Sequence, residues 1–183
     1  SGQDPFALRR RLLQNQPRFL TVLDLLEQTS LWSEPPSKGR FRGMAIHFSF
    51  ASIVGEVAEI SIGDNGSVTV HKMTCVVDCG RVVNPSIIES QMESAMIDGL
   101  TAALRGGVHI SEGKVQQANY DTYKLMHINE VPEFVIHIVE NSEAPGGVGE
   151  PAVPPSMPAL TNAIYAATGQ RVRSLPIEST KKT

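Results

Sequence analysis

Residues 53–77, which read IVGEVAEISIGDNGSVTVHKMTCVV, decide the fold. Apolar residues alternate with polar or small ones through Ile53–Ile62 and again through Val68–Val77, which is typical of β-strands. The residues between them, Gly63-Asp64-Asn65-Gly66, have the composition of a hairpin turn. The apolar positions of the second strand change parity near His71. The sequence therefore predicts a β-bulge there, or a strand that is buried on both faces.

A long helix is predicted directly after this hairpin. Asn84 is a favourable N-cap residue, and Pro85 suits the first helical position. Apolar residues then recur every three or four positions, which predicts a helix over 85–104 that ends before Gly106-Gly107. The apolar stripe consists of Ile88, Met92, Ala95, Met96, Gly99 and Ala103.

Two short helices are predicted before the sheet. The first begins at Asp4-Pro5 and the second near Pro17, and Trp32 closes the second. The apolar residues expected on their buried faces are Leu8, Leu12 and Leu13 in the first helix and Phe19, Leu20, Leu23 and Leu26 in the second. Because 33–39 is rich in Pro, Ser and Gly, we predict a helical N-terminal segment and linker over 1–39 and a main unit over 40–183.

The remaining elements complete an α+β pattern. Further strands are predicted at 41–50, 108–110, 115–118 and 134–139. A last helix is expected over 159–168, with Ser156 as its cap and Gly169 at its end. This order of helices and strands favours an α+β fold with a mixed or antiparallel sheet and helices packed on one face.

Composition excludes several classes of function. The 183 residues carry a scattered net charge of −3, so we expect no nucleic-acid partner, and no apolar run has the length of a membrane span. Cys75 and Cys79 would lie roughly 13 Å apart on an extended strand, too far for a disulfide, so we interpret them as buried free thiols. The five histidines show no pair at metal-ligand spacing, and we predict no metal ligand in this chain.

The glycine loop, residues 144–151 (APGGVGEP), combines three glycines with one carboxylate. Glycine lets a large ligand approach the backbone, and the amide N–H groups can point at an anionic or carbonyl-rich partner. Glu150 is therefore a candidate general base. The alternative is a surface turn whose glycines only reverse the chain. A phosphate-binding P-loop is disfavoured because the Gly-Lys-Ser/Thr sequence is missing.

Several separated motifs resemble one family. The segment 78–85 (DCGRVVNP) followed by Gln91 resembles the "D-x-G…NP…Q-E-G-G" segment of the large subunit of molybdenum hydroxylases, the xanthine dehydrogenase and aldehyde oxidoreductase family. Residues 147–151 match that family's G-x-G-E-P active-site loop. The opening 4–9 and the tail 158–176 resemble the branch that contains the isoquinoline 1-oxidoreductase β-subunit. The resemblance runs in order over nearly the whole chain.

This resemblance implies an activity and a cofactor. Glu150 matches the family glutamate that acts as general base and takes a proton from the hydroxyl on molybdenum. In the family, the oxygen of that hydroxyl then attacks a carbon of an N-heterocycle or aldehyde, and hydride passes to the metal centre. Gly147, Val148 and Gly149 match backbone that lies against the pterin, and Gln91 matches a recurrent glutamine. The implied cofactor is molybdopterin cytosine dinucleotide with molybdenum. The implied partners are the rest of the molybdenum subunit, an iron–sulfur subunit with 2Fe-2S clusters, a possible cytochrome and a small-molecule substrate, in a bacterial periplasm or cytoplasm.

The chain also departs from the family. Ser94-Ala95 stands where the family has two glycines. Family large subunits are several times longer, so this chain resembles only their C-terminal portion and should be inactive alone, without cofactor. Since it begins with Ser1-Gly2, we interpret it as a processed or excised fragment.

Several residues have a second interpretation. A non-catalytic structural or assembly module that binds a partner chain is the alternative function, based on the basic cluster 9–11 and the small residues of helix 85–104. For Gln91, the alternative is a hydrogen bond to a neighbouring loop. Asp78 and Asn84 are interpreted as turn and cap residues. Glu56 and Glu59 are interpreted as ordinary ladder or surface carboxylates.

Overall fold

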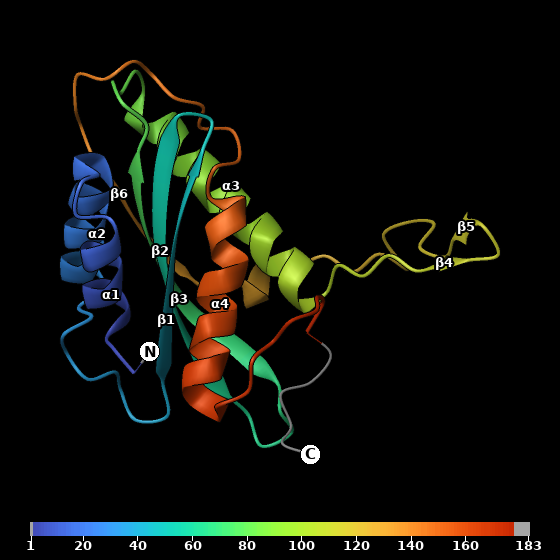
Figure 1. The fold of residues 1–183 in the computed structure, drawn as a ribbon. Coiled ribbons are helices and arrows are strands. Elements are labelled where there is room, and N and C mark those ends of the chain that lie inside the picture. Colours follow the sequence, from blue (N-terminus) through green and yellow to red (C-terminus); the bar gives the residue numbers. More distant parts are fainter. Residues whose placement is uncertain (1, 178–183) are drawn as a thin grey trace.

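The sheet has four strands in the order β1-β2-β3-β6 (Figure 1). The computed structural model describes residues 2–177. Strands β1 (Phe41–Ser49), β2 (Ser52–Ile62) and β3 (Val68–Asp78) form an antiparallel meander, and β6 (Glu133–Ile138) pairs parallel to β3. The sheet is therefore mixed, which confirms the predicted α+β class.

The predicted bulge in the hairpin is confirmed. Glu59 pairs with Lys72 and Ile60 pairs with Val70, so His71 is the extra residue on β3. One inserted residue reverses which side chains face the core, and this explains the change of apolar parity.

Helices cover both faces of the sheet, so the prediction of helices on one face is wrong. The helices α1 (Pro5–Leu12) and α2 (Pro17–Thr29) lie on one side, and α3 (Pro85–Leu104) and α4 (Val153–Thr168) lie on the other (Figure 1). Successive side chains of β2 point to opposite faces, and both sets are apolar. The first core contains Val22, Leu23, Leu26, Ile53 and Val57; the second contains Val54, Ala58, Met92, Met96 and Leu160.

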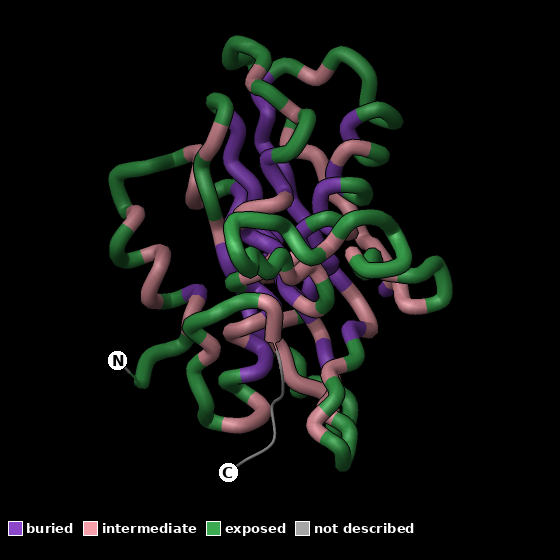
Figure 2. The backbone as a smooth tube through the Cα atoms, turned by 90° about the vertical axis from the view of Figure 1, so that its right-hand side faces the viewer, coloured by how far each residue is buried: buried purple, intermediate pink, exposed green. Residues whose placement is uncertain are grey.

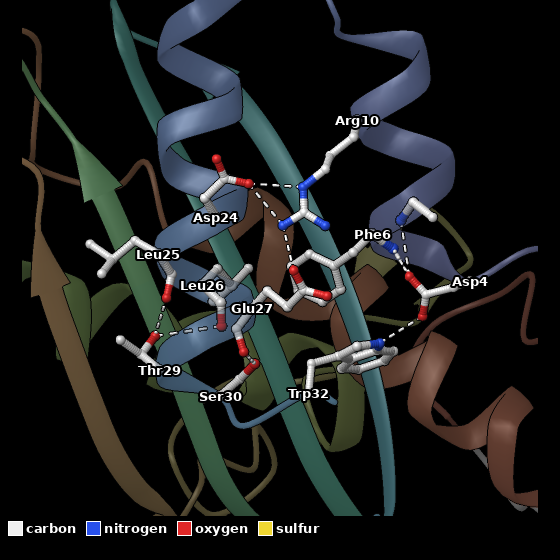
Figure 3. A network of polar contacts seen from close by, with 11 residues as sticks. Asp4, Phe6, Arg10, Asp24, Leu25, Leu26, Glu27, Thr29, Ser30 and Trp32 are labelled. Carbon is white, nitrogen blue, oxygen red and sulfur yellow. Dashed lines mark hydrogen bonds and ion pairs between the residues drawn. The ribbon is translucent and has the colours of Figure 1, made fainter. Parts of the chain in front are cut away.

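The N-terminal helices are joined by a polar network (Figure 3). Asp4 accepts from the amides of the first turn of α1 and, at 2.8 Å, from Nε1 of Trp32. Arg10 of α1 forms ion pairs with Asp24 and Glu27 of α2. In α1, Phe6 is buried and packs against the ring of Trp32. The prediction that Leu12 lies on the buried face of this helix is wrong, since Leu12 is 69% exposed.

The long helix α3 is confirmed with its predicted bounds. Asn84 caps it by accepting from the amide of Ile87 at 3.3 Å. Buried residues concentrate in the central strands, and they alternate with exposed residues along the helices (Figure 2). Within residues 2–177, no helix is long and apolar enough to cross a membrane.

The helix α4 packs against β1 at very short range. A Cβ on Gly43 would lie 2.0 Å from the amide nitrogen of Ala163, so only glycine permits this approach. The helix begins at Val153 and not at the predicted residue 159, because the two prolines that follow Val153 fit a first turn.

The segment between α3 and β6 differs most from the prediction. The two expected strands shrink to β4 (Ile110–Ser111) and β5 (Lys114–Val115), a separate hairpin. It lies on an arm, residues 105–127, that extends away from the body (Figure 1). A 3₁₀ turn, η1 (Ile128–Glu130), then leads into β6. The boundary between 1–39 and 40–183 stays a prediction.

Candidate functional site

The glycine loop crosses the end of the sheet at which α3 begins (Figure 1). Backbone hydrogen bonds tie its first half to the turn after β3. The amide of Arg81 donates to the carbonyl of Glu143 at 3.0 Å, and the amide of Gly146 donates to the carbonyl of Cys79 at 2.8 Å. These bonds fix where the loop starts.

Gly146 and Gly147 are required by packing within the chain. The amide of Gly147 donates to the carbonyl of Phe50 at 2.7 Å, and Oγ of Ser52 donates to the carbonyl of Gly147 at 2.8 Å. A Cβ on Gly146 would lie 2.4 Å from Oγ of Ser52, and one on Gly147 would lie 2.8 Å from Cβ of Phe50. Both polar backbone groups of Gly147 are thus satisfied inside this chain.

The second half of the loop has a different environment. A Cβ on Gly149 would have one neighbour within 4 Å, Nε2 of Gln91 at 3.8 Å. Within residues 2–177, no acceptor takes a hydrogen bond from the amides of Val148, Gly149 or Glu150. The Glu150 side chain is exposed and forms no hydrogen bond or ion pair with any described residue. We call this half, residues 148–150, the outward half: its three amides and the Glu150 carboxylate have no partner within residues 2–177.

Gln91 and α4 hold this outward half in place. Nε2 of Gln91 donates to the carbonyl of Gly149 at 3.5 Å, and the amide of Val153 donates to the carbonyl of Glu150 at 3.1 Å. The structure thus places all five predicted site residues around one loop. Glu150 also precedes the N-terminal end of α4, where the helix dipole favours a negative charge.

An apolar cleft of about 210 Å³ adjoins the loop. It lies between the turn after β3, the start of α3 and the loop, and it is lined in part by Cys79, Val83, Ile87, Pro145 and Val148. Val83 and Ile87 are exposed, so the surface beside the loop is apolar.

Asp78 connects three distant segments beneath the loop. Its carboxylate accepts from Nε and Nη2 of Arg18 at 2.9 and 2.8 Å, from Nδ2 of Asn141 at 2.8 Å and from the amide of Gly80 at 3.0 Å. Burial alone would raise the pKa of Asp78, but the hydrogen bonds from Arg18, Gly80 and Asn141 lower it below its usual value. Asp78 thus acts as the predicted turn residue through its bond with Gly80, and it also binds Arg18 and Asn141 from distant segments.

Two polar residues of the core differ from their predicted roles. Glu56 is fully buried, and its Oε2 lies 2.7 Å from Oγ of Ser156. Burial raises the pKa of Glu56 well above its usual range. Ser156 does not cap α4, because the helix begins at Val153 and Ser156 lies inside it, where its hydroxyl contacts the carbonyl of Ala152. Glu59 is partly exposed and pairs with Arg42, as a ladder carboxylate would.

The cysteines are free and buried, as predicted. In the part of the chain that the structure describes, no three His, Cys, Asp or Glu residues are grouped to hold a metal ion. The side chain of Glu150 and the amides of residues 148–150 are the polar groups of the loop that have no partner within residues 2–177.

Comparison with known proteins identifies the family. The family described as "Molybdopterin cofactor-binding domain" matches residues 24–132, more than half of the chain. The chain belongs to the molybdopterin cofactor-binding domain family. Its relatives include the β-subunit of isoquinoline 1-oxidoreductase from Brevundimonas diminuta, which is 31% identical over 179 residues covering 95% of this chain and 23% of that protein.

Other relatives of this molybdopterin cofactor-binding domain are also oxidoreductases. A nicotinate dehydrogenase subunit of Pseudomonas putida is 29% identical over 97% of this chain and 16% of that protein. The solved aldehyde oxidoreductase from Desulfovibrio desulfuricans is 28% identical with a TM-score of 0.60, covering 68% of this chain and 14% of that chain. The chain thus spans less than a quarter of the length of these relatives. The family match ends before the glycine loop.

The outward half of the loop fits a molybdopterin. Such a cofactor carries ring and phosphate oxygens, which are hydrogen-bond acceptors, and the amides of Val148, Gly149 and Glu150 are unpaired donors within residues 2–177. Since a Cβ at Gly149 would meet only Nε2 of Gln91, at a contact distance of 3.8 Å, a ligand can approach the backbone there closely. Gly147 offers no free amide, so any contact it makes with a cofactor is a van der Waals contact.

Proposed function

We propose that this chain is the C-terminal portion of the molybdenum-binding subunit of an oxidoreductase that hydroxylates N-heterocycles or aldehydes, with Glu150 as its general base. The observation that supports this most is the unpartnered Glu150 carboxylate beside three free amides, within a molybdopterin cofactor-binding domain. A base without the rest of the cofactor site has nothing to act on. We therefore expect no activity from the chain alone.

In this proposal, the loop residues and the cofactor have different roles. When bound, the molybdenum cofactor supplies the oxygen nucleophile and accepts the hydride. An Oε of Glu150 accepts the proton that the nucleophile loses, and the amides of Val148 and Gly149 hold an acceptor atom of the pterin. Gln91 donates to the carbonyl of Gly149 and so orients the peptide that carries the Glu150 amide. The cytosine dinucleotide form of the cofactor, an iron–sulfur partner subunit with 2Fe-2S clusters and a cytochrome belong to the same proposal.

A matched pair of glycine variants tests cofactor contact at the loop. In the intact subunit, Gly149→Ala is expected to change stability by less than about 0.5 kcal/mol, because the new Cβ would make only an ordinary contact, 3.8 Å from Nε2 of Gln91. If the pterin lies against Gly149, the new methyl group should displace it. A loss of about 1.4 kcal/mol in binding free energy would weaken cofactor binding about tenfold. Molybdenum and pterin per subunit and the thermal midpoint are measured together.

Gly146→Ala is the matched control. Its Cβ would press on Oγ of Ser52 inside the chain, so a loss of about 1–3 kcal/mol in unfolding free energy is expected. Full cofactor content in Gly149→Ala, with unchanged binding affinity, would refute contact between the pterin and Gly149.

Docking onto a partner chain is the second candidate function, and the arm favours it. The arm and the 3₁₀ turn that follows it expose Val108, Ile110, Val115, Tyr120 and Ile128. The other two features considered for docking are used within the chain: Arg10 pairs with α2, and Gly99 of α3 packs against Ser156 of α4. We infer that the arm contacts the rest of the molybdenum subunit.

The 183-residue chain by itself is expected to self-associate and to bind an apolar dye such as ANS. Replacing Ile110, Val115 and Tyr120 by serine should reduce both effects. Leu12→Ser on α1 is the control, because it removes an exposed apolar side chain that does not belong to the arm. A monodisperse monomer with no dye binding before any substitution would contradict docking through the arm.

A further inference from the structure

The hydroxyl of Ser156 has two acceptor neighbours but one proton. Its Oγ lies 2.7 Å from the carbonyl oxygen of Ala152 and 2.7 Å from Oε2 of Glu56. Both distances are those of full O–H···O hydrogen bonds, and a carbonyl oxygen carries no proton to donate. If Ser156 donates to Ala152, the proton of the second bond must come from Glu56.

The surroundings of Glu56 agree with this count of protons. Its Oε1 is buried and accepts a hydrogen bond from no residue in 2–177. An ionised carboxylate would leave a charged oxygen there without a donor, which costs far more than a neutral carbonyl oxygen does. The other titratable group against Glu56 is the Cys75 thiol on β3, and burial raises the pKa of that thiol. The acidic residues of α3 (Glu89, Glu93 and Asp98) are exposed, and β1 presents Ala45 at the paired position.

The same contact reaches the start of α4. Ser156 bonds to the carbonyl of Ala152, the N-cap residue, and the next amide, Val153, donates to the carbonyl of Glu150. A Cβ on Gly99 of α3 would lie 2.8 Å from Cβ of Ser156, so Ser156 packs directly against the backbone of α3 at Gly99. The link therefore runs from the centre of β2 to the peptide of Glu150 through three short contacts.

We propose that Glu56 is a neutral carboxylic acid that donates to Ser156 and thereby positions the start of α4 and Glu150. Glu56 touches neither cofactor nor substrate in this assignment and is a positioning residue. Its protonation and its bond to Ser156 stand on the core geometry alone, whereas the effect on turnover rests on the proposed function of Glu150.

The test compares three variants in the intact, cofactor-loaded subunit. Glu56→Gln keeps a donor to Ser156 and is expected to retain kcat per bound molybdenum within about threefold. Glu56→Leu and Ser156→Ala each break the link and should lower kcat about tenfold or more, with KM and cofactor content unchanged, because small misplacements of a reacting group are costly. The double variant Glu56→Leu/Ser156→Ala should be no slower than the slower single variant, since both changes break one link.

Infrared spectroscopy at neutral pH supplies a readout that does not depend on activity. The unsubstituted protein should show the C=O stretch of a buried carboxylic acid, and Glu56→Gln should remove it. Absence of that band, or a Glu56→Gln variant as slow as Glu56→Leu, would overturn the proposal. So would an unchanged kcat in both Glu56→Leu and Ser156→Ala. If Glu150 is not the base, the infrared band still appears and Glu150→Gln keeps its turnover, so the two failures are distinct.

Discussion

Turnover in the intact molybdenum subunit is expected to fall by about 10²–10⁴-fold when Glu150 is replaced by glutamine, the range that a positioned general base contributes. Glutamine keeps the size of the side chain but cannot accept the proton. Because the Glu150 side chain is exposed and has no hydrogen-bond or ion-pair partner among the described residues, the substitution removes no internal contact. Molybdenum and pterin content should therefore stay near that of the unsubstituted protein, and steady-state kinetics per bound molybdenum measures the loss.

Glu140→Gln is the matched control for this substitution. Glu140 is an exposed acid between β6 and the glycine loop, and its replacement should leave turnover unchanged. If Glu150→Gln retains turnover within a few-fold of the unsubstituted protein at equal cofactor content, Glu150 is not the base.

Replacing Asp78 by alanine is expected to cost about 3 kcal/mol of unfolding free energy, since removing one partner of a buried ion pair leaves the others unsatisfied. Asp78 is 1% exposed, and four hydrogen bonds converge on it from Arg18, Gly80 and Asn141. Arg18 is partly exposed and can be rehydrated, which limits the loss. Denaturant unfolding at neutral pH measures it.

The Asp78 effect should depend on pH in a defined direction. The folded-state pKa of Asp78 lies below its ordinary value of 3.8, so its contribution is present above that pH and is lost as pH falls through the folded-state pKa. The difference between Asp78→Ala and the unsubstituted chain should therefore shrink in strong acid. Asp24→Ala removes a surface partner of Arg10 that is 64% exposed, and it should cost less than about 1 kcal/mol. Equal losses for the two variants would contradict a buried anchor at Asp78.

Local signals predicted much of this fold. The bulge at His71 follows from strand alternation, and the bounds of α3 follow from Asn84-Pro85 and the apolar stripe. The prediction of helices on one face does not include α2, which the sequence places in a separate N-terminal segment but which covers the other face of the sheet. The apolar character of both Ile53 and Val54 on β2 already required two covers.

The core polar residues were beyond the reach of the sequence. Glu56 and Ser156 are separated by 100 positions, and Arg18 and Asp78 by 60, so no local pattern links them. The sequence also does not distinguish the glycines of the loop, although a Cβ on Gly146 would clash with Ser52 and one on Gly149 would not clash. That difference depends on the position of Phe50 and Ser52, which only the folded chain supplies.

The most direct test is to purify the protein from its native host and to measure the amounts of molybdenum and pterin bound per chain. This measurement tests whether the domain belongs to an oxidoreductase that carries the molybdenum cofactor. We expect close to one molybdenum and one pterin for each copy of this sequence. A purified protein that contains this sequence and holds neither would contradict the proposal that Glu150 serves a molybdenum centre.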